Sequence, residues 1–235
     1  MAYCKLIFKE KYLLFIMSIL NTFFDKIFII NLDSRKDRWT ECLELLKKYN
    51  ITNFERISAI RPIYKNIPKN YYSNLEVNQA EWYVTGCVGC KLSHYKVIAL
   101  AKNRNYHNFL VLEDDFSIDL FDFEKQIKLA LDELKHTQWD MIYLGGNNLI
   151  KPTDINNYKY LHEAKQVNTT HAYAMNHTLY DKCLEKIPIC GTEIDVFYKR
   201  EIQKINKVFC IYPSLIKQRK SKSNIFNSVM DYKFD

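Results

Sequence analysis

The stretch Phe109-Leu110-Val111-Leu112-Glu113-Asp114-Asp115 decides the fold, because an apolar run leads directly into three consecutive carboxylates. The apolar part is typical of a buried strand. Neighbouring carboxylates repel one another, whereas a hard divalent cation with oxygen ligands, such as Mn²⁺ or Mg²⁺, offsets that repulsion. In an extended chain Glu113 and Asp115 face one way and Asp114 the other. The stretch therefore predicts a strand ending in a cation site; an acidic turn after a buried strand is the alternative interpretation.

Strand-like and helix-like segments alternate along the rest of the chain. Apolar runs predict strands over residues 26–32, 54–59, 108–112, 139–144, 167–175 and 208–212. One helix is predicted to begin after Ser34, which would act as its N-cap, with Asp37 in the first turn. Helical periodicity predicts further helices over residues 91–103, 123–134, 179–187 and 193–205. This alternation predicts an α/β fold with a mainly parallel central sheet flanked by helices. Residues 61–78, with two prolines, are expected to form a long surface loop.

Polar or glycine residues stand at the predicted carboxyl ends of several strands. Asn31 follows the first strand, the acidic triplet (Glu113, Asp114 and Asp115) follows another, and Gly145 and Gly146 follow a third. Ligands of open α/β sheets bind beyond the carboxyl ends of the strands. A cation held there can in turn hold a diphosphate. This edge is therefore the leading candidate for a sugar-nucleotide site.

The length and composition are those of a single large domain. The chain has 235 residues, of which 48% are hydrophobic, enough for a sizeable core. We expect one domain over residues 25–235, preceded by an apolar extension over residues 1–24. The apolar part of that extension is shorter than the ~20 residues that span a bilayer, and no small-residue cleavage site follows it. A cytoplasmic location and peripheral membrane contact both remain open.

The charge and the cysteines narrow the classes of ligand. A net charge of +7 favours anionic ligands, but no arginine-rich stripe with interleaved aromatic residues is present, so we expect no nucleic acid partner. Of the seven cysteines, Cys87 and Cys90 form a lone CxxC. A structural zinc site would need a second Cys or His pair at matching spacing, and the sequence has none. Buried thiols are therefore the expected interpretation.

An ordered series of short motifs resembles glycosyltransferase family 25, which includes sugar transferases of lipopolysaccharide and glycan biosynthesis and collagen galactosyltransferases. The motifs are Ile29-Ile30-Asn31-Leu32-Asp33 with Arg35, Asp37 and Arg38, then Arg56-Ile57-Ser58-Ala59, Gly89-Cys90-Lys91-Leu92-Ser93-His94, Leu112-Glu113-Asp114-Asp115, Tyr143-Leu144-Gly145, His171-Ala172-Tyr173, Asp195, Pro213 and Gln218. The resemblance runs from about residue 26 to about residue 225. The family usually closes with Ser-Asp-Ile, whereas this chain has Ser223-Asn224-Ile225, which puts any contribution of the tail to metal or donor binding in doubt.

The resemblance implies a GT-A-like fold that binds a nucleotide sugar, and inversion at the anomeric carbon. The implied function is a metal-dependent transfer of a hexose, galactose or glucose, from a UDP-sugar to a hydroxyl of a glycan or protein acceptor, with Mn²⁺ or Mg²⁺ as cofactor. Asp115 is the first candidate ligand of the metal and Glu113 the second, with His171 as a third. The alternative for His171 is a hydrogen-bonded core histidine on a strand.

Other residues have implied roles in donor binding and catalysis. Candidates for donor binding are Asn31, Arg38, Ser93, His94, Asp114 and Gly145. Asp195 is the candidate general base and Glu193 the second choice. For Asp195 the alternative is a plain structural role, because carboxylates near a helix N-terminus are favoured by the helix dipole.

Three other functions fit parts of the sequence. The first is a catalytically inactive glycan-binding or scaffold protein of the same fold. The second is a metal-dependent phosphoryl-transfer enzyme that uses the same carboxylates, although the chain has no GxxxxGK[ST] loop. The third is a basic adaptor at a membrane surface, based on the N-terminal apolar run and the basic tail.

Overall fold

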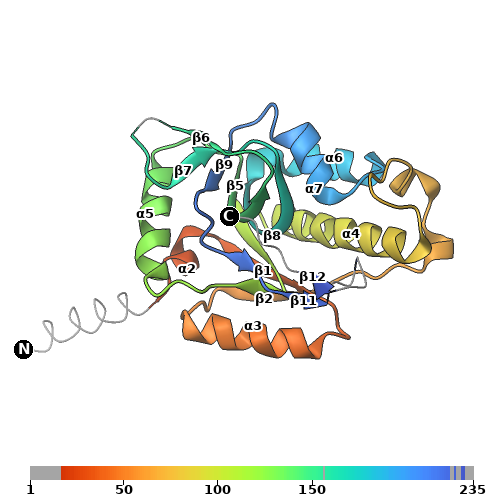
Figure 1. The fold of residues 1–235 in the computed structure, drawn as a ribbon, viewed down its shortest axis with the longest axis horizontal. Helices are drawn as coiled ribbons and strands as arrows, with labels where there is room; N and C mark the ends of the chain where they lie inside the picture. The colour runs from red at the N-terminus through yellow and green to blue at the C-terminus, as the bar shows by residue number, and fades with distance from the viewer. Residues whose placement is uncertain (1–16, 156, 223–224, 226–228, 231–235) are drawn as a thin grey trace, which may run out of the picture.

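A computed structural model describes residues 17–155, 157–222, 225 and 229–230, and its centre is an eight-stranded sheet (Figure 1). The strands are β1 Lys26–Asn31, β2 Phe54–Ser58, β3 Asn108–Glu113, β5 Met141–Asn148, β6 Thr153–Asp154, β7 Leu161–Glu163, β8 Val167–Asn176 and β9 Val208–Ile211. Their order across the sheet is β2-β1-β3-β8-β5-β9-β7-β6.

Most strands of this sheet point the same way. β1 pairs in parallel with β2 and with β3, and β5 pairs in parallel with β9. Because β8 is antiparallel to both β3 and β5, these two strands share a direction. β7 is antiparallel to β9 and to β6, so within the sheet β7 and β8 are the reversed strands. The predicted α/β fold with a mainly parallel sheet is confirmed, and the carboxyl ends of β1, β2, β3 and β5 lie at one edge.

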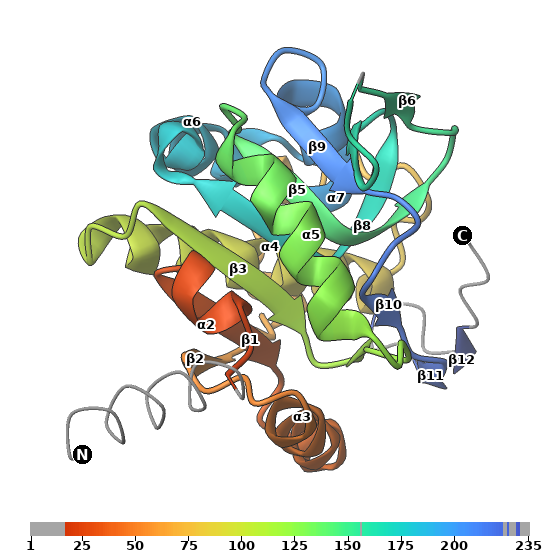
Figure 2. The same cartoon turned by 90° about the vertical axis from the view of Figure 1, so that its left-hand side faces the viewer.

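Helices cover both faces of the sheet. They are α2 Leu20–Phe23, α3 Lys36–Lys48, α4 Glu81–Asn103, α5 Phe123–Lys135, α6 Tyr180–Lys186 and α7 Ile194–Phe197. Side chains of α2, α3 and α5 join one hydrophobic cluster, and side chains of α4, α6 and α7 join another. Figure 2 shows α5 in front of the sheet and α4 behind it. The sheet therefore separates two cores.

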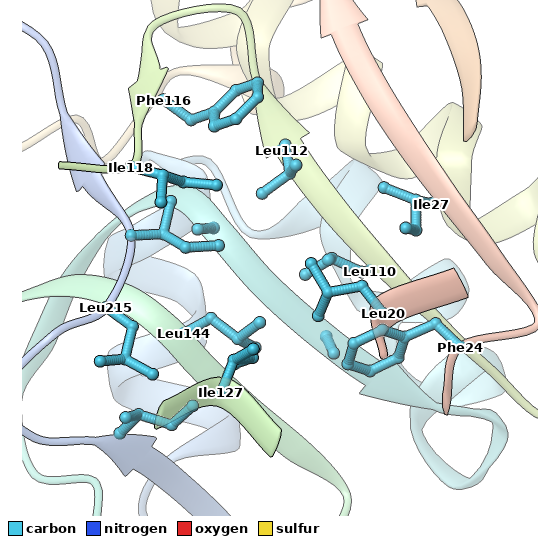
Figure 3. Packing of buried hydrophobic residues seen from close by; sticks show 14 of the residues in the cluster. Leu20, Phe24, Ile27, Leu110, Leu112, Phe116, Ile118, Ile127, Leu144 and Leu215 are labelled. Atoms are coloured by element: carbon cyan, nitrogen blue, oxygen red, sulfur yellow. The ribbon is translucent and has the colours of Figure 1, made fainter. Parts of the chain in front are cut away.

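The strand that carries the acidic triplet is buried on both of its faces. Leu110 and Leu112 pack in the cluster that includes Ile127 of α5 (Figure 3), whereas Phe109 and Val111 pack in the opposite cluster. All five side chains are 0% exposed. A strand covered on both faces needs an unbroken apolar run rather than an alternating one, which is why this stretch is so apolar up to Glu113.

The helix predicted over residues 91–103 begins ten residues earlier, at Glu81. The prediction was wrong because Gly86 and Gly89 favour a loop over a helix, each at a cost of about 1 kcal/mol relative to alanine. The structure uses Gly89 for close packing instead. A Cβ there would lie 2.5 Å from the carbonyl oxygen of Ile60, so the loop after β2 approaches α4 as closely as it does only because residue 89 has no side chain.

One further local prediction was wrong, and a predicted helix is shorter than expected. Ser34 does not cap α3, because the helix begins at Lys36 without a side-chain cap, and Asp37 pairs with Arg35 at 2.7 Å. The helix predicted over residues 193–205 is one α-helical turn, α7, followed by a π-helical turn over Tyr198–Ile202.

A short ribbon brings the C-terminal part of the chain back to the acidic edge. β10, Lys217–Gln218, pairs antiparallel with β4, Phe116–Ser117, which directly follows the triplet. The backbone N–H of Arg219 also donates to the carbonyl of Asp115 at 2.7 Å. Beyond it, β11 Ser221–Lys222 pairs with β12 Val229–Met230. Apolar patterning could not predict strands of two residues.

The described end of the predicted N-terminal extension packs against the domain. Leu20 is 0% and Phe24 is 1% exposed, and both belong to the core on the α5 side. Residues 1–16 lie outside the described part of the chain, and the boundary at residue 24 stays a prediction. Among the described residues, no helix is both long enough and apolar enough to cross a membrane.

Candidate functional site

The acidic triplet lies at the end of β3, beside the end of β1, and Asp114 is fixed by two buried donors. Nδ2 of Asn31 donates to Oδ2 of Asp114 at 2.7 Å, and Nη1 of Arg38 donates to its Oδ1 at 2.6 Å. Asn31 is 1%, Arg38 5% and Asp114 6% exposed. Charge-assisted bonds in such surroundings are strong and directional, so this carboxylate has one defined orientation.

The side-chain amide of Asn31 is fully engaged in hydrogen bonds within the protein. Its Nδ2 also donates to the carbonyl of Arg35 at 3.1 Å, and its Oδ1 accepts from Nε of Arg56 at 2.9 Å. Both ends of the amide thus have protein partners. A direct contact of Asn31 with a nucleotide stays a prediction. In the structure, Asn31 holds Asp114 by a hydrogen bond.

Asp115 is buried with one of its oxygens unsatisfied. Oδ2 accepts from Nη1 of Arg38 at 3.1 Å and from Nε2 of Gln218 at 3.2 Å. Oδ1 has no hydrogen-bond partner within the described part of the chain. Burial and then the charge of Glu113 raise the pKa of Asp115 to about 7, against the opposing effect of Arg38. A buried carboxylate oxygen without a donor is costly, so this atom is suited to a bound cation.

Glu113 turns toward α4 and β8. Its Oε1 accepts from Oγ1 of Thr170 at 2.6 Å and lies 3.3 Å from Nε2 of His94. Burial raises the pKa of Glu113, but the hydrogen bonds and charge of these surroundings outweigh it and lower the pKa overall. Nδ1 of His94 in turn lies 3.0 Å from Oη of Tyr173. Glu113 is therefore held in a hydrogen-bonded position between α4 and β8.

Two adjoining cavities open beside the triplet. The first, of about 140 Å³, is lined by all three acids and by Arg38. The second, of about 120 Å³, is lined by Glu113 and Asp195. The residues that line both are Cys90, Glu113, Gln218 and Ile225. The structure thus brings the predicted metal ligands Glu113 and Asp115 and the predicted base Asp195 to one continuous lining.

Asp195 is held by backbone donors at the start of α7. Its Oδ2 accepts from the N–H of Thr169 at 3.1 Å, and its Oδ1 accepts from the N–H of Val196 at 2.9 Å. Burial raises the pKa of Asp195, although these two bonds oppose the increase. Thr169 has φ of 67°, a left-handed conformation that is rare for a β-branched residue. Strain of this kind is characteristic of functional sites.

Glu193 is more firmly engaged than Asp195. It accepts from Oη of Tyr83 at 2.9 Å, from the N–H of Glu76 at 3.1 Å and from Oγ1 of Thr192 at 2.8 Å. These donors tie the end of the long loop to the start of α7. Both acids line the second cavity, and the base role of either one stays a prediction.

His171 and Gly145 lie apart from these two cavities. The ring nitrogens of His171 are 3.1 Å from Oγ1 of Thr169 and 3.3 Å from the carbonyl of Ile216. The side chain lines a third cavity, of about 840 Å³, which shares Gln218 with the other two. A Cβ on Gly145 would lie 2.7 Å from Nε2 of His171 and would also meet the carbonyl of Ile216. The structure therefore does not bring His171 into one cavity with Glu113 and Asp115. The metal role of His171 and the donor contact of Gly145 stay predictions.

Ser93 lines the first cavity and also fixes its wall. Its Oγ accepts from the N–H of Ile60 at 2.8 Å and donates to the carbonyl of Gly89 at 2.7 Å. Sequence reasoning expected a buried thiol at Cys90 and gave no role to Thr169 or Thr170, which line the second cavity. The CxxC and the Thr-Thr pair can be seen in the sequence, but neither pattern predicts which distant residues these side chains contact, such as Glu113.

Comparisons with known proteins agree on one family. The model of glycosyltransferase family 25, described as a family of LPS biosynthesis proteins, matches residues 24–198. Procollagen galactosyltransferase 1-B of Xenopus laevis is 29% identical over 133 residues, covering 52% of this chain and 21% of that protein. Procollagen galactosyltransferase 2 of Homo sapiens is 30% identical over 131 residues, with the same coverage. The chain therefore spans about a fifth of the length of these relatives.

Two other matches refine this comparison. The inactive glycosyltransferase 25 family member 3 of Homo sapiens is 29% identical over 136 residues, covering 52% of this chain and 22% of that protein. The crystal structure of a glycosyltransferase involved in the glycosylation of the major capsid of PBCV-1 has a TM-score of 0.50 and 10% identity, covering 86% of this chain and 95% of that one. At that identity the likeness concerns the fold alone.

Proposed function

This chain belongs to glycosyltransferase family 25, and we propose that it is an inverting enzyme that moves a hexose from a UDP-sugar to a hydroxyl of a glycan or protein, with the help of a divalent cation. One observation carries the proposal. Glu113 lines both cavities, with Asp114 and Asp115 on one side and Asp195 on the other. Glycosyl transfer needs a place that stabilises a leaving diphosphate next to a base for the acceptor hydroxyl.

The acidic side fits a hard cation. The guanidinium of Arg38 pairs with both Asp114 and Asp115, and Oδ1 of Asp115 lacks a donor among the described residues. Asp115, with Glu113 beside it, would hold Mn²⁺ or Mg²⁺ through oxygen atoms. Such an ion, when bound, supplies charge stabilisation to the leaving diphosphate.

The rest of the first cavity suits the nucleoside part of a donor. Its lining includes the apolar side chains of Ile30, Leu32, Ala59 and Ile60, which offer flat contact to a base ring, while a few polar groups fix orientation. We assign Asp114 to hydroxyls of the ribose or the sugar. Asn31 and Arg38 would keep its carboxylate aimed, because both donate to it.

Asp195 is assigned as the general base. The N–H groups of Thr169 and Val196 orient its carboxylate. Burial raises its pKa, and a base works best when its pKa lies closer to the operating pH. Gln218 lines both cavities and, with the tail that carries it, would help to exclude water.

A panel of UDP-sugars, including UDP-galactose and UDP-glucose, tests the proposal by UDP release with and without Mn²⁺. We expect metal-dependent release from at least one donor. Asp115→Asn should abolish it and leave the thermal unfolding transition cooperative, whereas Asp119→Asn, an exposed acid four residues on, should not. Full activity of Asp115→Asn would refute the cation assignment.

An inactive glycan-binding protein is the second candidate, since a family member named inactive is as similar to this chain as the galactosyltransferases are. The same panel separates the two. Saturable binding of a donor or glycan without turnover of any UDP-sugar, in the presence of Mn²⁺, would replace the enzyme proposal by this one.

A further inference from the structure

Cys90, His94 and Glu113 bring three different ligand atoms together between the two cavities. The thiol sulfur, a ring nitrogen and a carboxylate oxygen all lie within 4.8 Å of one another. Cys90 and His94 are four residues apart on α4 and therefore project from the same face, and Glu113 reaches them from the end of β3. We propose that this cluster binds a thiophilic divalent cation such as Zn²⁺.

The set of donors distinguishes this site from the one at Asp115. Mn²⁺ and Mg²⁺ prefer oxygen ligands, whereas a thiolate, an imidazole and a carboxylate together are ligands typical of zinc. Zinc sites with three protein ligands leave a fourth position open. Cys90 and Glu113 line both cavities, so that open position would face the space where substrates are proposed to bind.

The surroundings of His94 are an independent observation in favour of a metal. Its Nδ1 lies 3.0 Å from Oη of Tyr173, which lies 3.1 Å from Oη of Tyr198. His94 is 1% exposed and both tyrosines are 0% exposed. This buried chain fixes the ring so that Nε2 points toward Glu113, at 3.3 Å. A histidine that binds a metal usually has its other nitrogen held in this way.

The cluster differs from the zinc site that the lone CxxC suggested, for which the sequence offers no second Cys or His pair. Cys87, the other member of the CxxC, lines the second cavity but is not part of the three-atom cluster. The fold supplies His94 and Glu113 in place of a second pair of cysteines. Burial raises the pKa of the Cys90 thiol well above its ordinary value, so a cation that binds there must displace the thiol proton to solvent.

A consequence for activity rests on the function proposed above. Glu113 is shared between this cluster and the oxygen site at Asp115. A zinc ion on Cys90 and His94 would withdraw Glu113 from that site and would project into both cavities. Zn²⁺ should therefore inhibit transfer supported by Mn²⁺.

Binding is tested with Co²⁺ alone as the probe, because a thiolate–cobalt bond gives an intense near-ultraviolet charge-transfer absorption. The full chain and Cys87→Ser should both develop this absorption with one equivalent of Co²⁺, and Cys90→Ser should not. Absence of the absorption in the full chain, or its persistence in Cys90→Ser, would overturn the proposal. Loss in Cys87→Ser with retention in Cys90→Ser would overturn it equally.

A second variant covers the case in which Cys90→Ser does not fold, as judged by circular dichroism. His94→Asn keeps the thiol and removes the imidazole. It should bind Co²⁺ at least about tenfold more weakly than the full chain, a loss of the size seen when a metal site loses a supporting group. Equal affinity would show that His94 is not a ligand and would refute the site.

The inhibition arm compares Zn²⁺ titrations of UDP release at fixed Mn²⁺, each protein normalised to its own rate without zinc. Half-inhibition of Cys90→Ser should need at least about tenfold more Zn²⁺ than the full chain. Equal sensitivity of the two would refute inhibition through this site. If no UDP-sugar is turned over at all, the proposed function fails while the cobalt absorption still decides the binding site.

Discussion

Replacing Lys91 by methionine tests whether a buried ammonium couples the long loop to the segment that carries Asp195. Lys91 is 0% exposed in the middle of α4. Its Nζ donates to the carbonyl of Tyr71 at 2.5 Å and to the carbonyl of Thr192 at 3.1 Å. The first carbonyl belongs to the long loop and the second lies three residues before Asp195. One side chain therefore fastens both segments to the same helix.

The size of the effect follows from these two bonds. Methionine preserves the length of the side chain but leaves the two carbonyls without their donor, and each unsatisfied buried group costs about 1–3 kcal/mol. Against this, burial lowers the pKa of Lys91, so removal of the charge recovers part of its desolvation penalty. We expect a net loss of about 2–4 kcal/mol in the free energy of unfolding. At about 2–4 °C per kcal/mol for a chain of this size, the melting temperature falls by about 5–15 °C.

The assay combines thermal unfolding with UDP release at a temperature where both proteins are folded. Lys96→Met is the matched control, since Lys96 is exposed on the same helix and donates to the carbonyl of Ser58. Surface changes of this kind stay within about 0.5 kcal/mol. Lys91→Met should lower kcat more than it weakens donor binding, because Asp195 loses its placement. A wild-type melting temperature would refute the energetic argument. A lower melting temperature with unchanged kcat would refute the coupling to Asp195.

Three further outcomes are expected. Asp195→Asn should keep the donor Kd and lower kcat by about 10²–10⁴-fold. Because burial raises the pKa of Asp195, the wild-type rate should fall as the pH drops through a value above the pKa of an ordinary Asp. A pH–rate profile without this acidic decline would contradict the assignment. Gly145→Ala should lower the urea midpoint by the equivalent of about 1–3 kcal/mol, because its Cβ would meet the carbonyl of Ile216; an unchanged midpoint would show that the strand yields freely. Burial raises the pKa of Cys42 to about 12, so iodoacetamide at mildly alkaline pH should leave Cys42 unmodified in the native protein and modify it in urea; rapid native labelling, read by mass spectrometry, would contradict its burial.

β1 and β3 could be predicted from the sequence because each is a run of apolar residues covered on both faces. Residues 108–112 were predicted as a strand and form β3 with one residue more. The start of α4 could not be predicted in the same way. Local propensity at Gly86 and Gly89 opposes a helix, and the contacts that favour one, such as the approach of Ile60 to Gly89, come from distant segments.

The position of the acidic residues could be predicted from the sequence, whereas their hydrogen-bond partners could not. The apolar run before Glu113 places the acids at the end of a strand, where the structure has them; their role as a cation site stays a prediction. Nothing local to Asn31 predicts that both ends of its amide are taken by protein, and nothing local to His171 predicts that both ring nitrogens have partners. Such assignments depend on which strands become neighbours, and that is a property of the sheet order.

The three adjacent acids acquire different roles because three different parts of the chain meet them. Asp114 is held from β1 and α3, through Asn31 and Arg38. Asp115 is met by the returning tail, through Gln218, and keeps one oxygen without a donor among the described residues. Glu113 faces α4 and β8. β3 lies between β1 and β8 in the sheet and ends at Glu113, and Asp114 and Asp115 lie in the turn that follows. The three acids therefore come within reach of different neighbours. The sheet order therefore determines what each acid contacts. On an edge strand the same three residues would lack either Arg38, which orients Asp114, or α4, which brings Cys90 and His94 to Glu113.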